Sequence, residues 1–467
     1  MNENQDGLQR SAVRTPDTIV ALSTPPGRSG IGVIRLSGPA SLNYTRLLLR
    51  KPDFTPEPNR VTLKTIRDPE SGDALDQALV TYFKSPHSFT GEDVIELSCH
   101  GSPVLLLEVV DALLRLGARA ADPGEFTLLA LSNGRLSLSQ AEAIRDLIDA
   151  QTNAATRQAA RQLGGELSTR LQPFKDSLIK IIVRLESSLE FVEDDLPDFA
   201  LESLSLQLES LIQNLETLAR TFHSGRLLKD GLRVTLAGRP NAGKSSIFNK
   251  LLTSDRAIVT DIPGTTRDSL SELLNLEGVP VLLTDTAGVR AAEDPIEHLG
   301  IERTRQAMAD ADLIVAVIDG SQPLTREDES LLAELPEAGY LIALNKSDLE
   351  TFGRATLNGS ARNIKPIPIS AKTGAGFDEL RRAMLSPFAD GGFQNTDFLI
   401  TNARHSDLLR RTADSLRASQ AAISEGATED LILVGLYDGL RFLGEITGET
   451  TPEDVLTQIF ATFCIGK

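Results

Sequence analysis

Apolar residues along the chain follow two different periods, and the change between them divides the chain into regions. Before about residue 130, short apolar runs typical of β-strands occupy residues 17–22, 31–36, 78–83 and 94–99. A longer apolar pattern at 104–116 predicts a helix that ends at Gly117. Short strands mixed with a helix predict an N-terminal domain of the mixed α/β class.

From about residue 137 the apolar residues recur every three or four positions, which is the period of an amphipathic helix. Ser139 and Glu142 have the spacing of a capping box, so we expect a helix to begin there. Pro173 lies inside a later apolar stripe and indicates a kink or a new helix start. Another stripe occupies 204–218, and we expect both stripes to form the packing core of a helical bundle.

Strands and helices alternate between about residues 231 and 385, and the helical period then resumes. Thr451-Pro452-Glu453-Asp454 is typical of a helix start, with proline in the first turn and acidic residues near the helix N-terminus. Helical segments on both sides indicate that the alternating region is inserted into a helical domain. The expected fold class is α/β plus α, with domains at 1–133, 134–230, 231–385 and 386–467.

The inserted region opens with a candidate phosphate-binding loop. Gly238-Arg-Pro-Asn-Ala-Gly243-Lys244-Ser245 follows the apolar run 233–237 and has the pattern G-x-x-x-x-G-K-S. In such a loop the glycines let backbone N–H groups surround a phosphate chain. The lysine reaches the β- and γ-phosphates, and the serine hydroxyl suits Mg²⁺. The pattern therefore predicts a P-loop nucleotide site.

Three further motifs, each after an apolar strand, indicate that the nucleotide is GTP. In Asn345-Lys346-Ser347-Asp348 the carboxylate can accept hydrogen bonds from N1–H and the 2-amino group of guanine, which adenine does not offer. Ser370-Ala371-Lys372 would support the base from its far side. In Asp285-Thr-Ala-Gly288 the carboxylate can hold Mg²⁺ through water, and the Gly288 N–H can sense the γ-phosphate. Four motifs in this order predict a Ras-like GTPase domain.

Composition limits the partners and the location. The 467 residues include 65 acidic and 47 basic side chains, a net charge of −18, which argues against a broad basic surface for nucleic acid. Tryptophan is absent and aromatic residues make up 4%, so base-stacking platforms are not expected to dominate. Cys99 and Cys464 predict no disulfide framework, and no apolar run approaches the ~20 residues of a membrane helix. We therefore expect a cytoplasmic protein.

Three segments resemble the tRNA-modification GTPase family MnmE, also called TrmE: Cys464-Ile465-Gly466-Lys467, Asp261-Ile-Pro-Gly-Thr-Thr-Arg-Asp268 and Val33-Ile-Arg-Leu-Ser-Gly38. The resemblance covers essentially the whole chain. It implies a cytoplasmic homodimer, joined through N-terminal domains that resemble tetrahydrofolate-binding modules. With the flavin-dependent partner MnmG (GidA), in a heterotetramer or larger complex, such a protein forms the 5-carboxymethylaminomethyl or 5-aminomethyl group on wobble uridine 34 of certain tRNAs. The one-carbon unit would come from 5-formyltetrahydrofolate or another tetrahydrofolate.

The resemblance also implies how GTP is hydrolysed. Val289 stands where many small GTPases place a glutamine, so another residue must orient the attacking water. By resemblance this residue is Glu297, although an acidic run taken alone is more often a solvated face. The resemblance also implies that K⁺ supplies the positive charge that an arginine finger supplies in other GTPases, and that hydrolysis requires pairing of two GTPase domains. Two roles remain for Arg290: it supplies the positive charge in place of K⁺, or it forms an ion pair at the surface.

The resemblance and the four motifs together give the expected ligand sets. For K⁺ they are Asn241, Thr260, Ile262 and Thr265, and for Mg²⁺ they are Ser245 and Thr266. The expected GTP-binding residues are Asn241, Ala242, Gly243, Lys244, Ser245, Ser246, Thr260, Asp261, Ile262, Pro263, Gly264, Thr265, Thr266, Asp285, Thr286, Ala287, Gly288, Asn345, Lys346, Asp348, Ser370, Ala371 and Lys372.

At the modification site, the resemblance implies folate contacts by Arg35, Glu96, Arg135 and Lys467. The arginines suit carboxylate or carbonyl groups, and Glu96 can accept from the N–H donors of a pterin. The family commonly has lysine where Arg135 stands. The resemblance implies that Cys464 acts as a thiolate or general acid. Without the resemblance, a lone cysteine beside a helix is more often a small buried apolar residue.

Two other functions share part of this sequence pattern. A ribosome-assembly GTPase would carry the same GTPase motifs together with a basic RNA-binding module, whereas this chain is acidic and ends in C-x-G-K. A nucleotide-controlled scaffold would need no turnover. Potassium-stimulated hydrolysis would therefore separate a scaffold from an enzyme.

Overall fold

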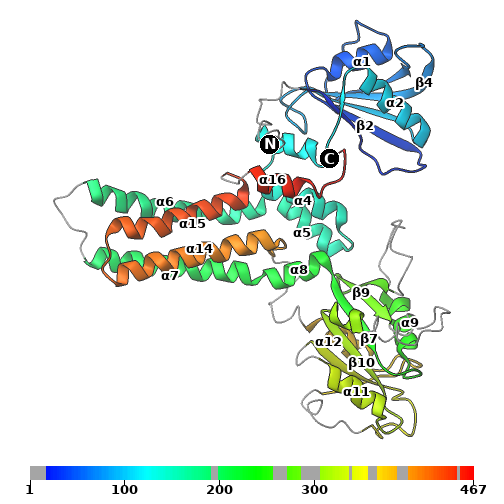
Figure 1. Ribbon diagram of the computed structural model, residues 1–467, viewed down its shortest axis with the longest axis vertical. Coiled ribbons are helices and arrows are strands. Elements are labelled where there is room, and N and C mark those ends of the chain that lie inside the picture. Colours follow the sequence, from blue (N-terminus) through cyan, green and yellow to red (C-terminus); the bar gives the residue numbers. More distant parts are fainter. Residues whose placement is uncertain are drawn as a thin grey trace, which may run out of the picture. The chain divides into compact units, whose positions relative to one another are not determined.

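The computed structural model describes residues 17–190, 198–255, 271–285, 305–335, 339–355, 365–386, 398–449 and 453–466. Contacts divide the chain into two compact units (Figure 1). One consists of Met1–Arg145 with Thr447–Lys467, and the other of Asp146–Ile446. The domain boundaries proposed from the sequence stay a prediction. Among the described helices, none combines the length and the apolar content needed to cross a membrane.

The first unit contains a sheet with strand order β3-β4-β5-β2-β1-β6 in its described part. Neighbouring strands are antiparallel, except that β1 and β6 are parallel. The strands are β1 (Ile19–Leu22), β2 (Ile31–Ser37), β3 (Val61–Arg67), β4 (Ala74–Phe83), β5 (Val94–His100) and β6 (Arg119–Ala120). The four strands predicted from the sequence are confirmed, although β4 begins four residues before the predicted start, whereas β3 and the two-residue β6 were not predicted.

Two helices, α1 (Ser41–Leu49) and α2 (Pro103–Arg115), pack their buried leucines against this sheet. The predicted helix at 104–116 is thus confirmed within one residue at each end. α3 (Glu125–Ser132) and the C-terminal helix α16 (Glu453–Phe460) belong to the same unit. A small core beneath them contains Leu138, Phe460 and Phe463, so the end of the chain packs on the N-terminal unit.

The predicted capping box at Ser139 and Glu142 is wrong, because α4 (Leu138–Asp149) begins one residue earlier than Ser139. The cap is instead Ser137, whose Oγ accepts from the Gln140 N–H at 3.3 Å. Gln140 Oε1 accepts in return from the Ser137 N–H at 2.9 Å. Ser139 and Glu142 are both buried within the helix.

Four long helices of the second unit lie side by side in Figure 1: α6 (Glu166–Glu190), α7 (Asp198–Arg220), α14 (Ala403–Ser424) and α15 (Glu429–Thr447). One hydrophobic core joins leucines of α6 and α7 to those of α14 and α15. The insertion of the GTPase region into a helical domain is therefore confirmed. α6 continues through Pro173, so no new helix starts there. α5 (Asn153–Leu163) and α8 (Phe222–Asp230) complete the helices before the insertion.

The inserted region folds around a sheet with described strand order β12-β11-β10-β7-β9-β8. All its neighbouring strands are parallel except β8 and β9. The strands are β7 (Leu232–Ala237), β8 (Ser271–Leu276), β9 (Val279–Asp285), β10 (Leu313–Asp319), β11 (Tyr340–Asn345) and β12 (Ile367–Pro368). The helices are α9 (Lys244–Asp255), α11 (Arg326–Glu334) and α12 (Phe377–Met384). Parallel strands bring the predicted motifs to one edge of the sheet, at the strands' carboxyl ends.

Candidate functional site

The loop between β7 and α9 has the backbone that a phosphate-binding loop requires. Asn241 has φ +62° and Gly243 has φ +99°, so both lie in the left-handed region. Asparagine tolerates this conformation and glycine has no Cβ to oppose it. Lys244 Nζ donates to the main-chain carbonyls of Gly238 at 2.7 Å and Arg239 at 3.0 Å. These two hydrogen bonds hold the loop backbone around the Lys244 side chain, which is expected to bind phosphate.

Two candidate oxygen ligands for a metal ion, from Ser245 and Asp285, lie together at the start of α9. Ser245 Oγ donates to Asp285 Oδ2 at 2.8 Å, and Asp285 is the last residue of β9 with 2% of its surface exposed. A hydroxyl and a carboxylate are the hard donors that Mg²⁺ prefers. The geometry therefore brings together the P-loop serine and the aspartate of the third motif.

The base-reading motif is tied directly to the phosphate loop. Asn345 Nδ2 donates to the Ala242 carbonyl at 2.9 Å, and Asn345 Oδ1 accepts from the Ala371 N–H at 3.1 Å. Asp348 Oδ1 accepts from Ser370 Oγ at 2.7 Å, and this bond holds the pKa of the Asp348 carboxyl below its usual value. Asp348 is therefore an ionised acceptor at neutral pH, as reading guanine requires.

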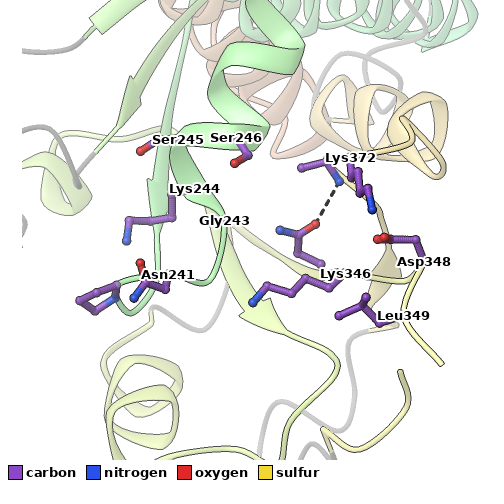
Figure 2. Close-up of a pocket in the computed structure, with 12 residues that line it drawn as sticks. Asn241, Gly243, Lys244, Ser245, Ser246, Lys346, Asp348, Leu349 and Lys372 are labelled. Atoms are coloured by element: carbon purple, nitrogen blue, oxygen red, sulfur yellow. Dashed lines mark hydrogen bonds between the residues drawn. The ribbon is translucent and has the colours of Figure 1, made fainter. Parts of the chain in front are cut away.

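These loops enclose a cavity of about 800 Å³. Figure 2 shows Asn241 and Lys244 on one side of it and Asp348 and Lys372 on the other. Its lining consists of Pro240, Asn241, Gly243, Lys244, Ser245, Ser246, Asn345, Lys346, Asp348, Leu349, Ala371 and Lys372. All of these except Pro240 and Leu349 belong to the expected GTP-binding set, so the structure brings together residues that lie more than a hundred positions apart.

Several predicted residues lie outside the described part of the chain. They are the loop residues Thr260, Asp261, Ile262, Pro263, Gly264, Thr265 and Thr266, then Thr286, Ala287, Gly288, Val289, Arg290 and Glu297, and the C-terminal Lys467. Their roles stay predictions.

A second cluster forms in the N-terminal unit around Arg35. Arg35 of β2 faces Glu96 of β5 in the sheet register, and its Nε and Nη2 donate to Glu96 Oε1 at 2.9 and 2.7 Å. The guanidinium carbon lies 5.8 Å from the ring centroid of Phe89 and 5.7 Å from that of Phe126. The Arg35 guanidinium therefore contacts a carboxylate and approaches two aromatic rings.

The C-x-G-K tail reaches the same cluster. The Gly466 carbonyl accepts from Arg35 Nη1 at 3.2 Å and from Ser23 Oγ at 3.1 Å. The Gly124 N–H donates to the Cys464 carbonyl at 3.4 Å. Cys464 itself is exposed, so the alternative of a small buried residue is wrong.

Arg135 reaches a neighbouring turn. Its Nε donates to the carbonyl of Ser88 at 3.2 Å, next to the Phe89 ring that Arg35 approaches. The segment at Ser88 and Phe89 therefore lies between the two arginines. Sequence analysis missed Phe89, Phe126 and Ser23, because no motif marks them and their positions depend on strand pairing.

Comparisons with known proteins cover both units. A family model described as the MnmE helical domain matches residues 138–464, and one described as the GTP-binding protein TrmE N-terminus matches residues 18–135. The tRNA modification GTPase MnmE of Koribacter versatilis is 44% identical over 455 residues, covering 97% of this chain and 99% of the relative. That of Chloroflexus aurantiacus is 42% identical over 455 residues, covering 97% and 100%. The G domain of the T. maritima FeoB iron transporter is 25% identical and covers 33% of this chain and 98% of its own, with a TM-score of 0.26, too low to support an argument.

Proposed function

This chain belongs to the tRNA modification GTPase MnmE family, and we propose that its GTP hydrolysis drives formation of the 5-carboxymethylaminomethyl or 5-aminomethyl group on wobble uridine 34 of certain tRNAs. The one-carbon unit comes from 5-formyltetrahydrofolate or another tetrahydrofolate. A flavin-dependent partner, MnmG, completes the catalytic complex in the cytoplasm. The observation that carries this proposal is the hydrogen bond from Arg35 to the Gly466 carbonyl, because it brings the C-x-G-K tail to a cationic, aromatic cluster outside the GTP cavity.

In the GTPase domain, Lys244 and the P-loop N–H groups bind the phosphates and Asp348 binds guanine. Ser245 and Thr266 hold Mg²⁺, which neutralises phosphate charge when bound. The pair of oxygens at Ser245 and Asp285, 2.8 Å apart, suits such a hard cation. The scaffold alternative is disfavoured because the family is a GTPase, and the ribosome-assembly alternative because the family modifies tRNA.

Hydrolysis in this proposal depends on K⁺ and on pairing of two GTPase domains. Asn241 lines the cavity, which supports its side-chain carbonyl as one ligand of the proposed K⁺ site, and Thr260, Ile262 and Thr265 are proposed as the others. When bound there, K⁺ supplies positive charge near the β–γ bridge. Glu297 orients the attacking water.

The folate site is proposed at Arg35, Glu96, Arg135 and Lys467. The Arg35 guanidinium lies 5.8 Å from the Phe89 ring centroid and 5.7 Å from that of Phe126 and pairs with Glu96, and this combination of aromatic and polar groups supports a pterin as the ligand. Cys464 is exposed at the end of the same tail that docks on Arg35. This exposure supports the proposal that its thiol acts as thiolate or general acid on the one-carbon unit.

The homodimer is proposed to form on the sheet of the N-terminal unit. Val61, Leu63 and Leu79 are 60%, 61% and 41% exposed, although all three are apolar. Leu63 pairs with Leu79 across β3 and β4, so the three side chains share the face opposite the buried core residues Ile66 and Val80. A second copy covering this face would remove the apolar surface from water.

The experiment that tests the proposal is mass analysis of nucleosides from tRNA of cells that lack this protein. We expect the 5-substituted wobble uridines to disappear and to return when the intact gene is restored. An unchanged set of modified uridines in the deletion strain would show that the proposed function is wrong.

A further inference from the structure

Two buried carboxylates pair with cations of the phosphate-binding and base-reading loops. Arg239 is the second residue of the phosphate loop, yet it is not among the described residues that line the cavity. Its Nη2 lies 3.6 Å from Asp319 Oδ2, and its Nε lies 3.3 Å from Asp328 Oδ2. Lys346 of the base-reading motif places its Nζ 2.6 Å from the same Asp319 Oδ2. The two carboxylates are only 2% and 1% exposed at their side chains.

Local hydrogen bonds fix both carboxylates. Asp319 ends β10, and its Oδ1 accepts from the N–H of Ser321 at 3.0 Å and from its Oγ at 2.6 Å, which leaves Oδ2 directed at the cations. Asp328 Oδ2 accepts from the N–H of Thr325 at 3.0 Å and from its Oγ1 at 2.8 Å, in the capping box of α11. Burial raises the pKa of Asp319, but the hydrogen bonds from Lys346 and Ser321 outweigh burial, so its pKa lies below the usual value. The carboxyl group is therefore charged at neutral pH.

We propose that Asp319 is a positioning residue for nucleotide binding, which it serves by holding Arg239 of the phosphate loop and Lys346 of the base-reading loop at one carboxylate oxygen. Both cations lie within 3.6 Å of that oxygen. Without the Asp319 charge, Lys346 would lose the carboxylate that lies 2.6 Å from its Nζ and Arg239 would keep only Asp328, so the two cations would no longer share a counter-charge. Lys346 also has φ +67°, a backbone conformation that its neighbours must hold. Asp319 thus sets the spacing between the loops that bind phosphate and guanine.

The primary test is the affinity of the full-length protein for GDP with Mg²⁺, measured by equilibrium titration and by dissociation rate. Asp319→Asn keeps the size and can still accept from Ser321, but it removes the shared charge. We expect GDP affinity to fall about tenfold or more, mainly through faster dissociation. The matched control is Glu334→Gln, which removes a carboxylate from α11 whose partner Arg305 lies 3.0 Å away at the exposed surface. It should stay within about twofold of the unmodified protein.

A double-mutant cycle separates positioning from a general loss of stability. In the Lys346→Met background, Asp319→Asn should weaken GDP binding several-fold less than it does alone, because one of the two cations is gone. Arg239→Gln should also weaken GDP binding, although Arg239 does not line the cavity. If Asp319→Asn fails to fold, the double-mutant cycle of Arg239→Gln and Lys346→Met tests the proposal instead. Non-additive effects of these two substitutions on GDP affinity would support a carboxylate oxygen shared by both cations. Fully additive effects, or unchanged affinity in Asp319→Asn, would overturn the proposal. The inference rests on the proposed GTP-binding residues. Because GDP titration needs no tRNA, its result can be interpreted even if the proposed role in tRNA modification is wrong.

Discussion

Replacing Gly466 with alanine tests whether the docked C-terminal tail serves tRNA modification. Gly466 has φ +93°, and a Cβ placed there would lie 2.6 Å from the Leu22 carbonyl oxygen and 2.9 Å from the Ser23 Cα. Both are backbone atoms that cannot swing aside. Gly426 offers a matched control, since it has φ +67° with no atom within 4 Å of the added Cβ. Both substitutions carry the left-handed strain, but only Gly466→Ala must displace the tail.

The expected magnitude follows from the contacts that the tail would lose. The left-handed conformation costs about 1–2 kcal/mol at either position and so cancels in the comparison. Gly466→Ala also loses the bond from the charged Arg35, worth roughly 1.5–3 kcal/mol, and the bond from Ser23, worth roughly 0.5–1.5 kcal/mol. A difference of about 3 kcal/mol would lower the ratio of docked to free tail about a hundredfold in Gly466→Ala compared with Gly426→Ala.

Three measurements check this reasoning. Hydrogen exchange at the Gly124 N–H, which donates to the Cys464 carbonyl, should speed up in Gly466→Ala but not in Gly426→Ala. Wobble-uridine modification with the partner present should fall at least about tenfold, which is less than the full loss of docking because substrate binding can recover part of it. GTP hydrolysis should stay near that of the unmodified protein in both variants. Equal modification by the two alanine variants would refute the functional role of the docked tail.

Four further outcomes are expected. Asp348→Asn should weaken GTP binding by about 1–3 kcal/mol and shift preference towards xanthosine triphosphate, as competition titrations would show, and unchanged GTP affinity would remove Asp348 from base reading. Hydrolysis should be faster in KCl than in NaCl at matched ionic strength, and Asn241→Ala should abolish the difference if Asn241 is a ligand. Glu297→Ala should slow phosphate release with little change in GTP affinity, and normal release would mean that another group holds the catalytic water. Cys464→Ser should spare hydrolysis and stop modification, and modification at the unmodified protein's rate would mean that the tail is structural. At pH 8 a thiol reagent should label Cys464 rapidly and Cys99 only after unfolding, because burial raises the pKa of Cys99 to about 12; equal labelling rates would contradict its burial.

The sequence alone predicted the candidate binding residues wherever those residues lie within one short motif. The phosphate loop and the Asn345–Asp348 motif each place donors and acceptors within a few residues, so their geometry is set locally. The parallel sheet then brings them to one edge, which is a property of the fold class rather than of any single residue. For this reason the described lining of the cavity contains only two residues, Pro240 and Leu349, that the sequence analysis did not name.

Features that depend on distant partners were missed or misplaced. Arg35 and Gly466 are 431 positions apart, and no periodic pattern predicts the bond between them. The strand β3 was not predicted because Val61 and Leu63 carry its apolar pattern on an exposed face, where burial does not reinforce it. The capping box was misplaced because two serines two residues apart, Ser137 and Ser139, both have an acceptor three positions later, and only packing decides between them.

The GTP cavity and the cluster around Arg35 belong to different compact units, and the division falls within α4, between Arg145 and Asp146. Arg145 Nη1 donates to Thr462 Oγ1 at 2.6 Å, two residues before Cys464. Asp146 is 8% exposed, and its Oδ1 lies 2.9 Å from Lys229 Nζ on α8, the helix that leads into β7 and the phosphate loop. Arg145 therefore makes its contact within the first unit, and Asp146 makes its contact within the second. Because Gly466 lies in the unit that does not contain the GTP cavity, we expect Gly466→Ala to lower tRNA modification while GTP hydrolysis continues.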